Sequence, residues 1–510
     1  MPSLQITMRR SCFNVLSHTA AIPLPPSSCV RRSGASNPMG RAILGVALGT
    51  LGVLTMGASA EAAAQPDPQV RALLSDISAQ RIEQNIRTLA AFGTRHTASE
   101  TDSETRGIGA ARRWVERELR ACSADSGGRL QVSTQQWVEP ASRTLAVPTT
   151  LVNVIAELPG DSPASRRRVL VVSGHYDSRA TDLMDAAIDA PGSNDDASGT
   201  AVSIELACTM AKQHFDATLV FIAVAGEEQG LFGSAHYAQQ AQRDDVNIEA
   251  MITNDIVGSS IGDHGQRDAK RLRLFADGSD PLRRLSASSG SSAETSPMKP
   301  ERRAELQTLA LAGGTDDLPT QQFARHLVTS TEQYLPGFTV QLVQRRDRYL
   351  RGGDHIPFLE RGYTAVRFTE PFEHFDHQHQ TVRQEGQRVY GDLPEFVDYA
   401  FVADVARVNA AGLATLALAP AAPKEVRIDA SELTNDTTLF WAASSDPAIA
   451  GWRVLWRDTG ALHWEHSQDV NRATTQLTLP VSKDNVVFGV QSVSARGHAS
   501  LASYPLPFRR

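Results

Sequence analysis

The chain contains little cysteine, with four residues in 510. Cys12 and Cys29 precede the cleavage point expected below, so only Cys122 and Cys208 would remain in a mature chain. These two lack the close spacing of a cysteine pair that binds a metal. They form either one disulfide in an oxidising compartment or two buried thiols, and the sequence leaves both alternatives open.

The chain also has no excess of positive charge. The formal net charge is −7, which argues against a protein that binds nucleic acid non-specifically. Short basic runs occur at 166–168 and 345–348, and we interpret them as solvated surface. The composition is 41% hydrophobic and 21% charged, which is ordinary for globular protein, and the length allows two or three domains.

The hydrophobic run nearest the N-terminus is short for a membrane span. It covers 42–56, about 15 residues where a spanning helix needs roughly 20. Arg41 precedes this run and small residues at 58–64 follow it, which is the order of a secretory signal peptide. Residues 1–64 are therefore predicted to be a signal region, with an upstream extension before Met39 that we hypothesise is not part of the working protein. A mature chain without a stable membrane span, periplasmic or secreted, is expected; a retained anchor is the alternative.

Apolar strands alternate with amphipathic helices between residues 69 and 418. Strands are expected at 151–158, 169–173, 219–225, 250–253 and 363–368, and helices within 69–122 and at 198–212, 318–323 and 393–418. The runs at 169–173 and 219–225 are almost entirely apolar, so these two strands should be buried on both faces. The prediction is an α/β fold with a mostly parallel mixed sheet flanked by helices. The stretch 258–347 shows no clear pattern and is expected to hold insertions.

The pattern changes after the Pro-Ala-Ala-Pro linker at 420–423. Short alternating strands are expected at 426–428, 437–441, 451–456, 475–479 and 486–494. This spacing predicts a small all-β sandwich over 424–510. With Trp441, Trp452 and Trp456, the segment resembles a fibronectin type III domain. It carries no recognisable chemistry, so we interpret it as a stabilising or docking module.

The first polar cluster follows the expected strand at 169–173 and contains His175 and Asp177. Open α/β sheets place their functional sites at such strand ends. An imidazole is a good zinc ligand, and a carboxylate two residues later can accept the other ring N–H and fix the tautomer. Alone the pattern is weak, because a loop histidine with an ordinary hydrogen bond looks the same.

The second cluster, Pro-Gly-Ser-Asn-Asp-Asp-Ala-Ser-Gly at 191–199, lies just before a predicted helix. Asp and Ser are common at helix starts because they cap free N–H groups. One of Asp195 and Asp196 is therefore expected to cap the helix. The other remains free to bridge two metal ions, since a carboxylate has two oxygens.

Further carboxylates and imidazoles end the later strands. Glu227 and Glu228 follow the strand at 219–225, and their mutual repulsion must be offset. One of them could bind metal while the other acts as general base, as metal-assisted hydrolysis requires; a solvated surface pair is the alternative. Asp255 ends the next strand, and three histidines fall within 374–379. Two zinc ions that share a carboxylate need five ligands, which the chain can supply as two His, two Asp and one Glu.

In this order, the motifs Gly-His-Tyr-Asp-Ser, Pro-Gly-Ser-Asn-Asp-Asp-Ala-Ser-Gly, Ala-Gly-Glu-Glu-Gln-Gly-Leu-Phe-Gly-Ser and Asn-Asp-Ile-Val-Gly resemble the M28 family of metallopeptidases. The likeness covers residues 69–418, and we expect a zinc peptidase domain there. It implies peptide substrates and a pair of zinc ions as cofactors. The roles that it implies are the following: His175 and Asp255 hold one ion, Glu228 and a late His hold the other, Asp195 bridges the two, Glu227 is the general base, and Asp177 supports His175.

We assign the late ligand to His379, with His377 as the alternative. Many family members have Tyr before this histidine, whereas Gln378 stands here, so the donor to a developing oxyanion is left open. The Asp354-His355 pair also matches a family segment near the substrate pocket. The predicted function is an exported aminopeptidase. Carboxypeptidases and single-zinc glutaminyl cyclases share the scaffold, and a non-catalytic receptor-like ectodomain is a further alternative.

Overall fold

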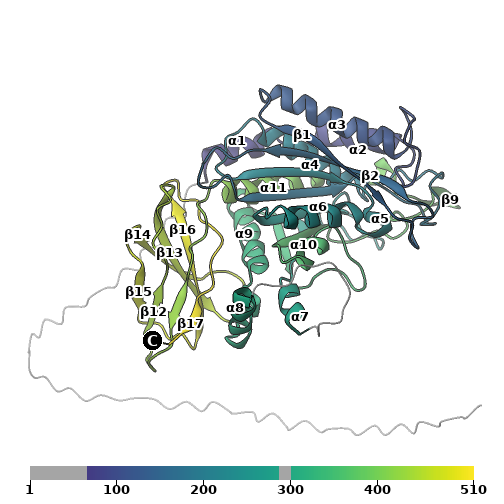
Figure 1. Ribbon diagram of the computed structural model, residues 1–510. Helices are drawn as coiled ribbons and strands as arrows, with labels where there is room; N and C mark the ends of the chain where they lie inside the picture. Colours follow the sequence, from purple (N-terminus) through teal and green to yellow (C-terminus); the bar gives the residue numbers. More distant parts are fainter. Residues whose placement is uncertain (1–65, 287–299, 510) are drawn as a thin grey trace, which may run out of the picture. The chain divides into compact units, whose positions relative to one another are not determined.

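The computed structural model describes residues 66–286 and 300–509, and these belong to one compact unit of the chain. The expected signal region and the hypothesis about residues 1–38 lie outside the described residues. The fold prediction is confirmed: a large mixed sheet is flanked by helices, and smaller, mainly antiparallel sheets follow at the C-terminus (Figure 1).

The main sheet has eight strands in the order β1-β2-β4-β3-β5-β8-β6-β7. Their bounds are β1 Gln131–Glu139, β2 Thr149–Leu158, β3 Val169–His175, β4 Thr218–Val224, β5 Ile248–Asn254, β6 Arg271–Phe275, β7 Thr339–Val343 and β8 Ala365–Thr369. The central pairs β4-β3, β3-β5 and β5-β8 are parallel, as is β6-β7, and the remaining pairs are antiparallel. The carboxyl ends of β3, β4 and β5 therefore meet at one edge.

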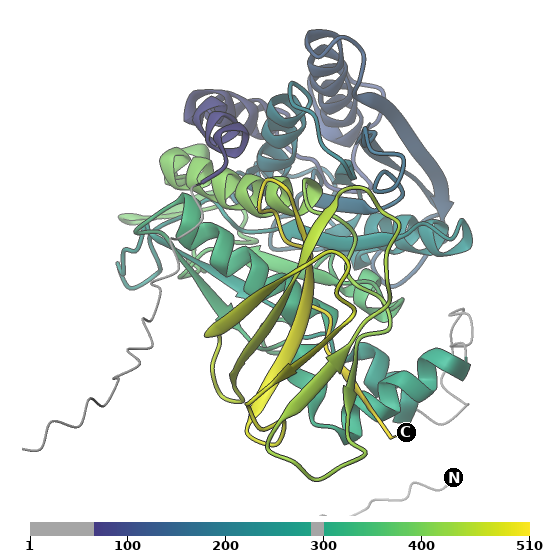
Figure 2. The same ribbon diagram turned by 90° about the vertical axis from the view of Figure 1, so that its left-hand side faces the viewer.

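Helices cover both faces of this sheet because its central strands, such as β3 and β4, are buried on both sides. On β3, Leu170 and Val172 join one hydrophobic cluster, while Val171 joins another. The first cluster is covered by α1 Pro68–Asp76, α2 Ala79–Ala91, α3 Gly107–Asp125, α4 Ala197–Met210, α9 Pro319–Tyr334 and α11 Tyr399–Ala417. The second is covered by α6 Phe232–Arg243 and α10 Ile356–Glu360 (Figures 1 and 2).

The remaining short elements of the α/β part are α5 Glu227–Gly230, α7 Asp280–Ser286, α8 Pro300–Leu311, η1 Gly314–Asp317, β9 Arg383–Glu385, β10 Arg388–Tyr390 and η2 Pro394–Phe396. The stretch 258–347, which showed no clear pattern in the sequence, thus supplies two strands of the main sheet, β6 and β7. A disulfide joins Cys122 on α3 to Cys208 on α4. This settles the alternative that the sequence left open in favour of the bridge.

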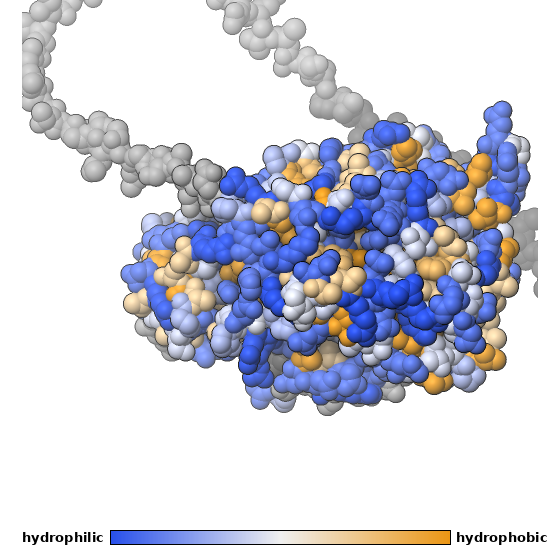
Figure 3. Space-filling view, turned by 90° about the horizontal axis from the view of Figure 1, so that it is seen from above, coloured by the Kyte–Doolittle hydropathy of each residue, from blue (hydrophilic) through white to orange (hydrophobic). Residues whose placement is uncertain are grey.

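The helix α11 is long and apolar enough to cross a membrane, and among the described helices it alone passes that test. Most of it is buried inside the protein, where it packs against α2, α4 and α9. It is therefore used as a core helix. The face of the protein seen from above is mainly hydrophilic, with hydrophobic residues in small scattered groups (Figure 3), as is typical of a water-exposed surface.

The C-terminal strands form two small sheets, ordered β15-β12-β11-β17 and β14-β13-β16. Their bounds are β11 Arg427–Asp429, β12 Thr437–Phe440, β13 Ile449–Asp458, β14 His466–Asn471, β15 Gln476–Leu479, β16 Val486–Ser494 and β17 Leu506–Phe508. Leu439 from one sheet and Val454 from the other share a core with Trp452. A buried ion pair, Arg457 with Asp317, joins this part to the α/β part at 2.9 Å.

Candidate functional site

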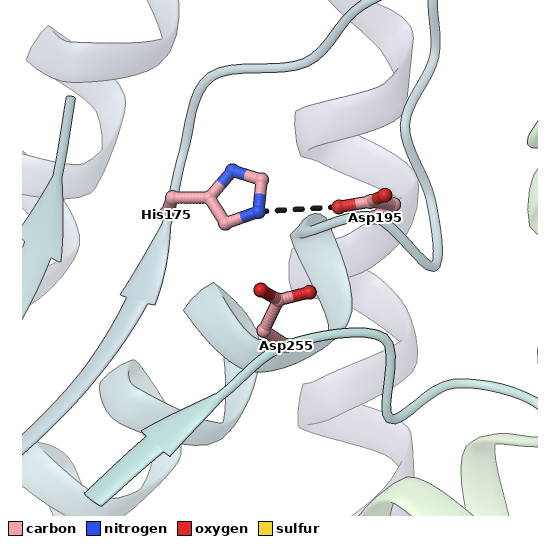
Figure 4. A group of neighbouring side chains, drawn as sticks. All are labelled: His175, Asp195 and Asp255. Atoms are coloured by element: carbon pink, nitrogen blue, oxygen red, sulfur yellow. Dashed lines mark ion pairs between the residues drawn. The ribbon is translucent and has the colours of Figure 1, made fainter. Parts of the chain in front are cut away.

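Side chains from three neighbouring strand ends converge at one edge of the sheet. His175 ends β3, Asp255 follows β5, and Glu227 with Glu228 follow β4 after the turn at Gly226. Figure 4 shows His175 and Asp255 pointing toward Asp195, which comes from the loop before α4. His175, Asp195, Asp255 and the side chain of Glu228 are buried and Glu227 is half-buried, at the place where open α/β sheets hold their ligands.

The adjacent residues Asp195 and Asp196, just before α4, make different contacts. Asp196 is the N-cap: its Oδ1 accepts a hydrogen bond from the Gly199 N–H at 2.8 Å. Its Oδ2 accepts one from the His175 main-chain N–H at 3.0 Å, which ties the helix start to the end of β3. Asp195 points away from the helix into the cluster. Asp196 is therefore the residue that caps the helix, and Asp195 is the one left free to face the cluster.

Both oxygens of Asp195 face an imidazole. Oδ1 lies 3.1 Å from His175 Nε2, and Oδ2 lies 2.8 Å from His379 Nε2. Glu228 Oε2 is 3.2 Å from the same nitrogen of His379. Two groups that could each hold a metal ion result, His175 with Asp195 and Asp255, and Asp195 with Glu228 and His379; within each, the ligand atoms lie within 4.8 Å of one another. Asp195 belongs to both.

The donors in these groups fit zinc. Imidazole nitrogen and carboxylate oxygen are among its usual ligands. Glu228 Oε1 is buried without a hydrogen-bond partner, and His175 Nε2 makes no aligned hydrogen bond although it lies 3.1 Å from Asp195 Oδ1. Buried polar atoms in native proteins are nearly always paired, so atoms left unpaired on the inward side of the cluster are suited to a cation.

Without a cation, the cluster retains protons. Burial alone would lower the pKa of His379, but Glu228 and Asp195 outweigh it and raise that pKa to about 10. Burial would likewise lower the pKa of His175, yet Glu227, Asp177 and Asp195 hold it well above its usual value. Burial raises the pKa of Glu228 as well. A set of carboxylates that keeps nearby imidazoles protonated has an excess of negative charge, which divalent cations would neutralise.

Asp177 supports the site through different atoms from those expected. His175 Nδ1 donates to the main-chain carbonyl of Asp177 at 3.2 Å, while the nearest carboxylate oxygen is 3.6 Å away. That carboxylate instead accepts main-chain N–H groups from Gly226, Glu227 and Glu228 at 3.0 to 3.3 Å. Asp177 therefore leaves His175 Nε2 free to face Asp195 and also fixes the turn that carries both glutamates.

Glu227 belongs to neither candidate metal group, although it lies beside both. Burial raises its pKa well above the usual value, and the charges of Asp255, Asp354 and Glu228 add to this effect despite His175. Asp354, itself buried, has its pKa raised to about 7 by burial. Its neighbour His355 hydrogen-bonds through Nε2 to the Arg346 carbonyl at 2.7 Å, and belongs to neither group of the described residues. A protonatable carboxylate next to the metal groups is placed where a general base is needed.

The sequence left His377 and His379 as alternatives, and the structure separates them. His379 faces Asp195 and Glu228, whereas the His377 ring stacks on His374 and on Phe396 with centroids 3.7 Å apart in both cases. Burial lowers the pKa of His377 to about 4. Gln378 Nε2 donates to Asp195 Oδ2 at 3.3 Å, so its amide lies at the cluster.

Two residues that hold the Asp195 loop were not found from the sequence. Asp392 Oδ2 accepts the Asp195 N–H at 2.7 Å, and its Oδ1 accepts the Asn194 N–H at 2.8 Å. Arg95, fully buried, donates to the carbonyls of Tyr176 and Gly192 at 2.7 and 2.9 Å and thereby links the His175 and Asp195 loops. Neither residue lies in a motif that the sequence analysis recognised, and no local pattern around either one signals its contact with the loop.

A network of buried charges lies behind Asp255. Arg367 Nη2 is 2.8 Å from Asp255 Oδ1, and its Nη1 is 3.3 Å from Asp347 Oδ2. Nearby, Glu373 contacts Arg273 and Arg348 at 3.0 and 3.1 Å and also Arg351. Because one oxygen of Asp255 is taken by Arg367, the other remains for the cluster.

This network predicts loss of stability in acid. Burial alone would raise the pKa of Glu373, but Arg348, Arg351 and Arg273 hold it at about 2. The folded pKa is depressed, so the stabilisation is complete above the ordinary value near 4.3 and is lost as pH falls toward 2, on the order of 3 kcal/mol. Urea unfolding between pH 5 and pH 2 should show this fall. Glu373→Gln should be less stable at pH 7 and should show a shallower fall; an equally steep fall in this variant would contradict the assignment.

Comparison with known proteins identifies the family. Residues 153–293 match the model of peptidase family M28. A probable zinc metalloprotease of Pyrenophora teres f. teres is 45% identical over 442 residues, covering 87% of this chain and 88% of the relative. One of Pyricularia oryzae is 45% identical over 447 residues, covering 87% and 85%. The chain belongs to peptidase family M28, which places it among the peptide hydrolases.

Solved structures of similar fold are more distant. The LapA aminopeptidase of Legionella pneumophila is 17% identical, covers 70% of this chain and 76% of its own, and has a TM-score of 0.46. The glutaminyl cyclase of Fimbriiglobus ruber is 18% identical, covers 66% and 94%, and has a TM-score of 0.44. At this distance the likeness does not choose between the two activities.

Proposed function

We propose that this chain is an exported aminopeptidase that holds two zinc ions and removes N-terminal residues from peptides. The observation that carries the proposal is the position of Asp195, whose two oxygens face two separate imidazoles at 3.1 and 2.8 Å. Relatives named probable zinc metalloproteases support the choice of metal. In this proposal His175 and Asp255 bind one ion, Glu228 and His379 bind the other, and Asp195 is shared.

The charge of the site favours the amino end of a peptide. Glu227 and Asp354 belong to neither candidate metal group of the described residues, and the charge of Asp354 adds to the burial that raises the pKa of Glu227. Carboxylates that bind no metal attract the ammonium group of a free N-terminus and repel a C-terminal carboxylate. Among the buried cations here, Arg367 is already engaged by Asp255 and Asp347, and Arg95 donates to the carbonyls of Tyr176 and Gly192. This supports an aminopeptidase over a carboxypeptidase.

The chain's own residues supply the proton transfers. Bound zinc would polarise the scissile carbonyl and acidify a water. Glu227, held by the Asp177 carboxylate through its main-chain N–H at 3.3 Å, takes the proton of the attacking water and later gives it to the leaving amine. His175 keeps Nε2 free for metal because Nδ1 donates to the Asp177 carbonyl.

Export is supported by the disulfide between Cys122 and Cys208, since such bonds persist in oxidising compartments. We propose that the working protein is periplasmic or secreted. For 424–510 we propose a fibronectin type III-like sandwich with a stabilising role, supported by its two sheets and their shared core. Sequencing the N-terminus of the mature protein would test export, and a chain that begins before residue 57 would contradict it.

The direct test is a panel of aminoacyl-4-nitroanilides with matched N-acetylated substrates. Release of nitroaniline from the free amines, and none from the acetylated forms, is expected of an aminopeptidase. A glutaminyl peptide added to the panel reports cyclisation, and a peptide with a blocked N-terminus reports carboxypeptidase activity. Activity limited to either of these, or no activity in a protein that contains zinc, would overturn the proposal.

Removing the metal should abolish the activity. Dialysis against dipicolinate is expected to remove two zinc ions per chain and to reduce hydrolysis to background, because no residue of the cluster can replace a Lewis acid. Adding Zn²⁺ should restore activity, whereas Mg²⁺, the matched control, should not, since it prefers oxygen ligands and waters. Metal analysis by mass spectrometry measures the stoichiometry. One ion per chain in the active enzyme would contradict the two-zinc proposal.

A further inference from the structure

Three histidines lie within six residues at 374–379, and only His379 reaches the candidate metal groups. His374 and His377 belong to neither group of the described residues. The His377 ring instead lies between His374 and Phe396, with centroid separations of 3.7 Å and interplanar angles of 4° on both sides. We call these three residues the ring stack.

The ring stack is attached to the core of the protein at one end. Phe396 is the last residue of η2, three residues before α11 begins. Asp398, the N-cap of α11, donates its N–H to the Gly258 carbonyl at 2.8 Å and accepts the Phe401 N–H at 3.1 Å. Because α11 is largely buried, Phe396 has a fixed position.

At the other end, the ring stack is joined to the ligand by a tight turn. The main-chain N–H groups of His377 and Gln378 both donate to the His374 carbonyl, at 2.9 and 3.1 Å. His379 follows with φ of 52°, in the left-handed region that residues other than glycine rarely adopt. Such a conformation persists only when its surroundings hold it. No regular helix or strand carries His379, so its position depends on the turn and on the contacts of this segment, the ring stack among them.

We propose that His377 is a positioning residue. Its ring, clamped between His374 and Phe396, fixes the turn so that His379 Nε2 points at Asp195 and Glu228, at 2.8 and 3.2 Å. This inference rests on the proposed function, in which His379 binds the second ion. The ring acts through its flat face, so another flat ring should replace it. A histidine that binds metal, in contrast, could not be replaced by a ring without nitrogen.

The test compares His377→Ala with His377→Phe. Zinc binding to metal-free protein is measured by competition with a chromogenic chelator, which separates the two ions by affinity. His377→Ala should weaken the binding of one zinc ion by about 10–100-fold, as the loss of partners that orient a ligand usually does. The affinity for the other ion should not change. His377→Phe should restore wild-type affinity. His236→Ala is the matched control, since that ring also stacks, on Trp137 at 4.3 Å, but outside the site.

Each outcome decides one claim. If His377→Phe loses an ion as His377→Ala does, His377 is a ligand and the positioning role is wrong. Equal zinc affinity in His377→Ala and wild type would also overturn the positioning role. So would a large fall in the thermal stability of metal-free His377→Ala that accompanies its loss of zinc affinity, because the substitution would then have damaged the fold in general. The proposed function fails separately, if wild-type protein binds a single ion or if His379→Ala still binds two.

Discussion

Glu227→Gln is expected to bind two zinc ions as the wild type does and to lose about 10²–10⁴-fold in kcat. The amide matches the carboxylate in shape but cannot accept the proton of the attacking water. Zinc should remain because Glu227 belongs to neither metal group, and the Asp177 hydrogen bond to its main-chain N–H does not depend on the side chain. Steady-state kinetics on the best nitroanilide, together with metal analysis, measures both quantities.

The adjacent residue provides the matched control. Glu228 differs from Glu227 by one position, but its Oε2 faces His379 at 3.2 Å. Glu228→Gln should therefore lose affinity for one ion, whereas Glu227→Gln should not. Near wild-type kcat in Glu227→Gln would remove the proposed general base. Loss of zinc in both variants would mean that both glutamates are ligands.

The parts of the site that could be predicted from sequence are those that local patterns determine. The strands 169–173 and 219–225 are apolar throughout, so both must be buried, and the polar residues after them must lie at the carboxyl edge of the sheet. His175, Glu227 and Glu228 are predictable in this way because His175 ends β3 and the two glutamates follow β4 after a two-residue turn. The sheet's centre is predictable for the same reason.

The remaining contacts depend on packing between distant segments. Asp392 holds the Asp195 N–H across 197 residues, and Arg95 holds the Gly192 carbonyl across 97. No periodicity encodes either contact. Strands β6 and β7 were also missed, because they lie in 258–347 among polar stretches and short helices. Asp177 was expected to use its carboxylate on His175, but three main-chain N–H groups of the glutamate turn compete for it.

Asp195→Ala is expected to remove both ions, whereas Asp255→Ala should remove one. Asp195 is shared by the two candidate groups, and Asp255 belongs only to the group of His175. Loss of a direct ligand should exceed the roughly 10–100-fold weakening seen when an outer partner is lost. Activity of Asp195→Ala should equal that of chelated wild type. Metal content after gel filtration, and zinc titration of the metal-free variants, give the two stoichiometries.

Asp196→Asn is the control for damage to the loop. Asp196 is equally close to α4, but its carboxylate accepts the Gly199 and His175 N–H groups and faces no metal group of the described residues. An asparagine can still cap the helix, so this variant should keep both ions and lose little stability. If Asp195→Ala retained one tightly bound ion, its two oxygens would not serve two metals, and the 3.1 and 2.8 Å contacts to His175 and His379 would be ordinary ion pairs. The two-zinc mechanism would then have to be abandoned, because nothing else among the described residues joins the two groups.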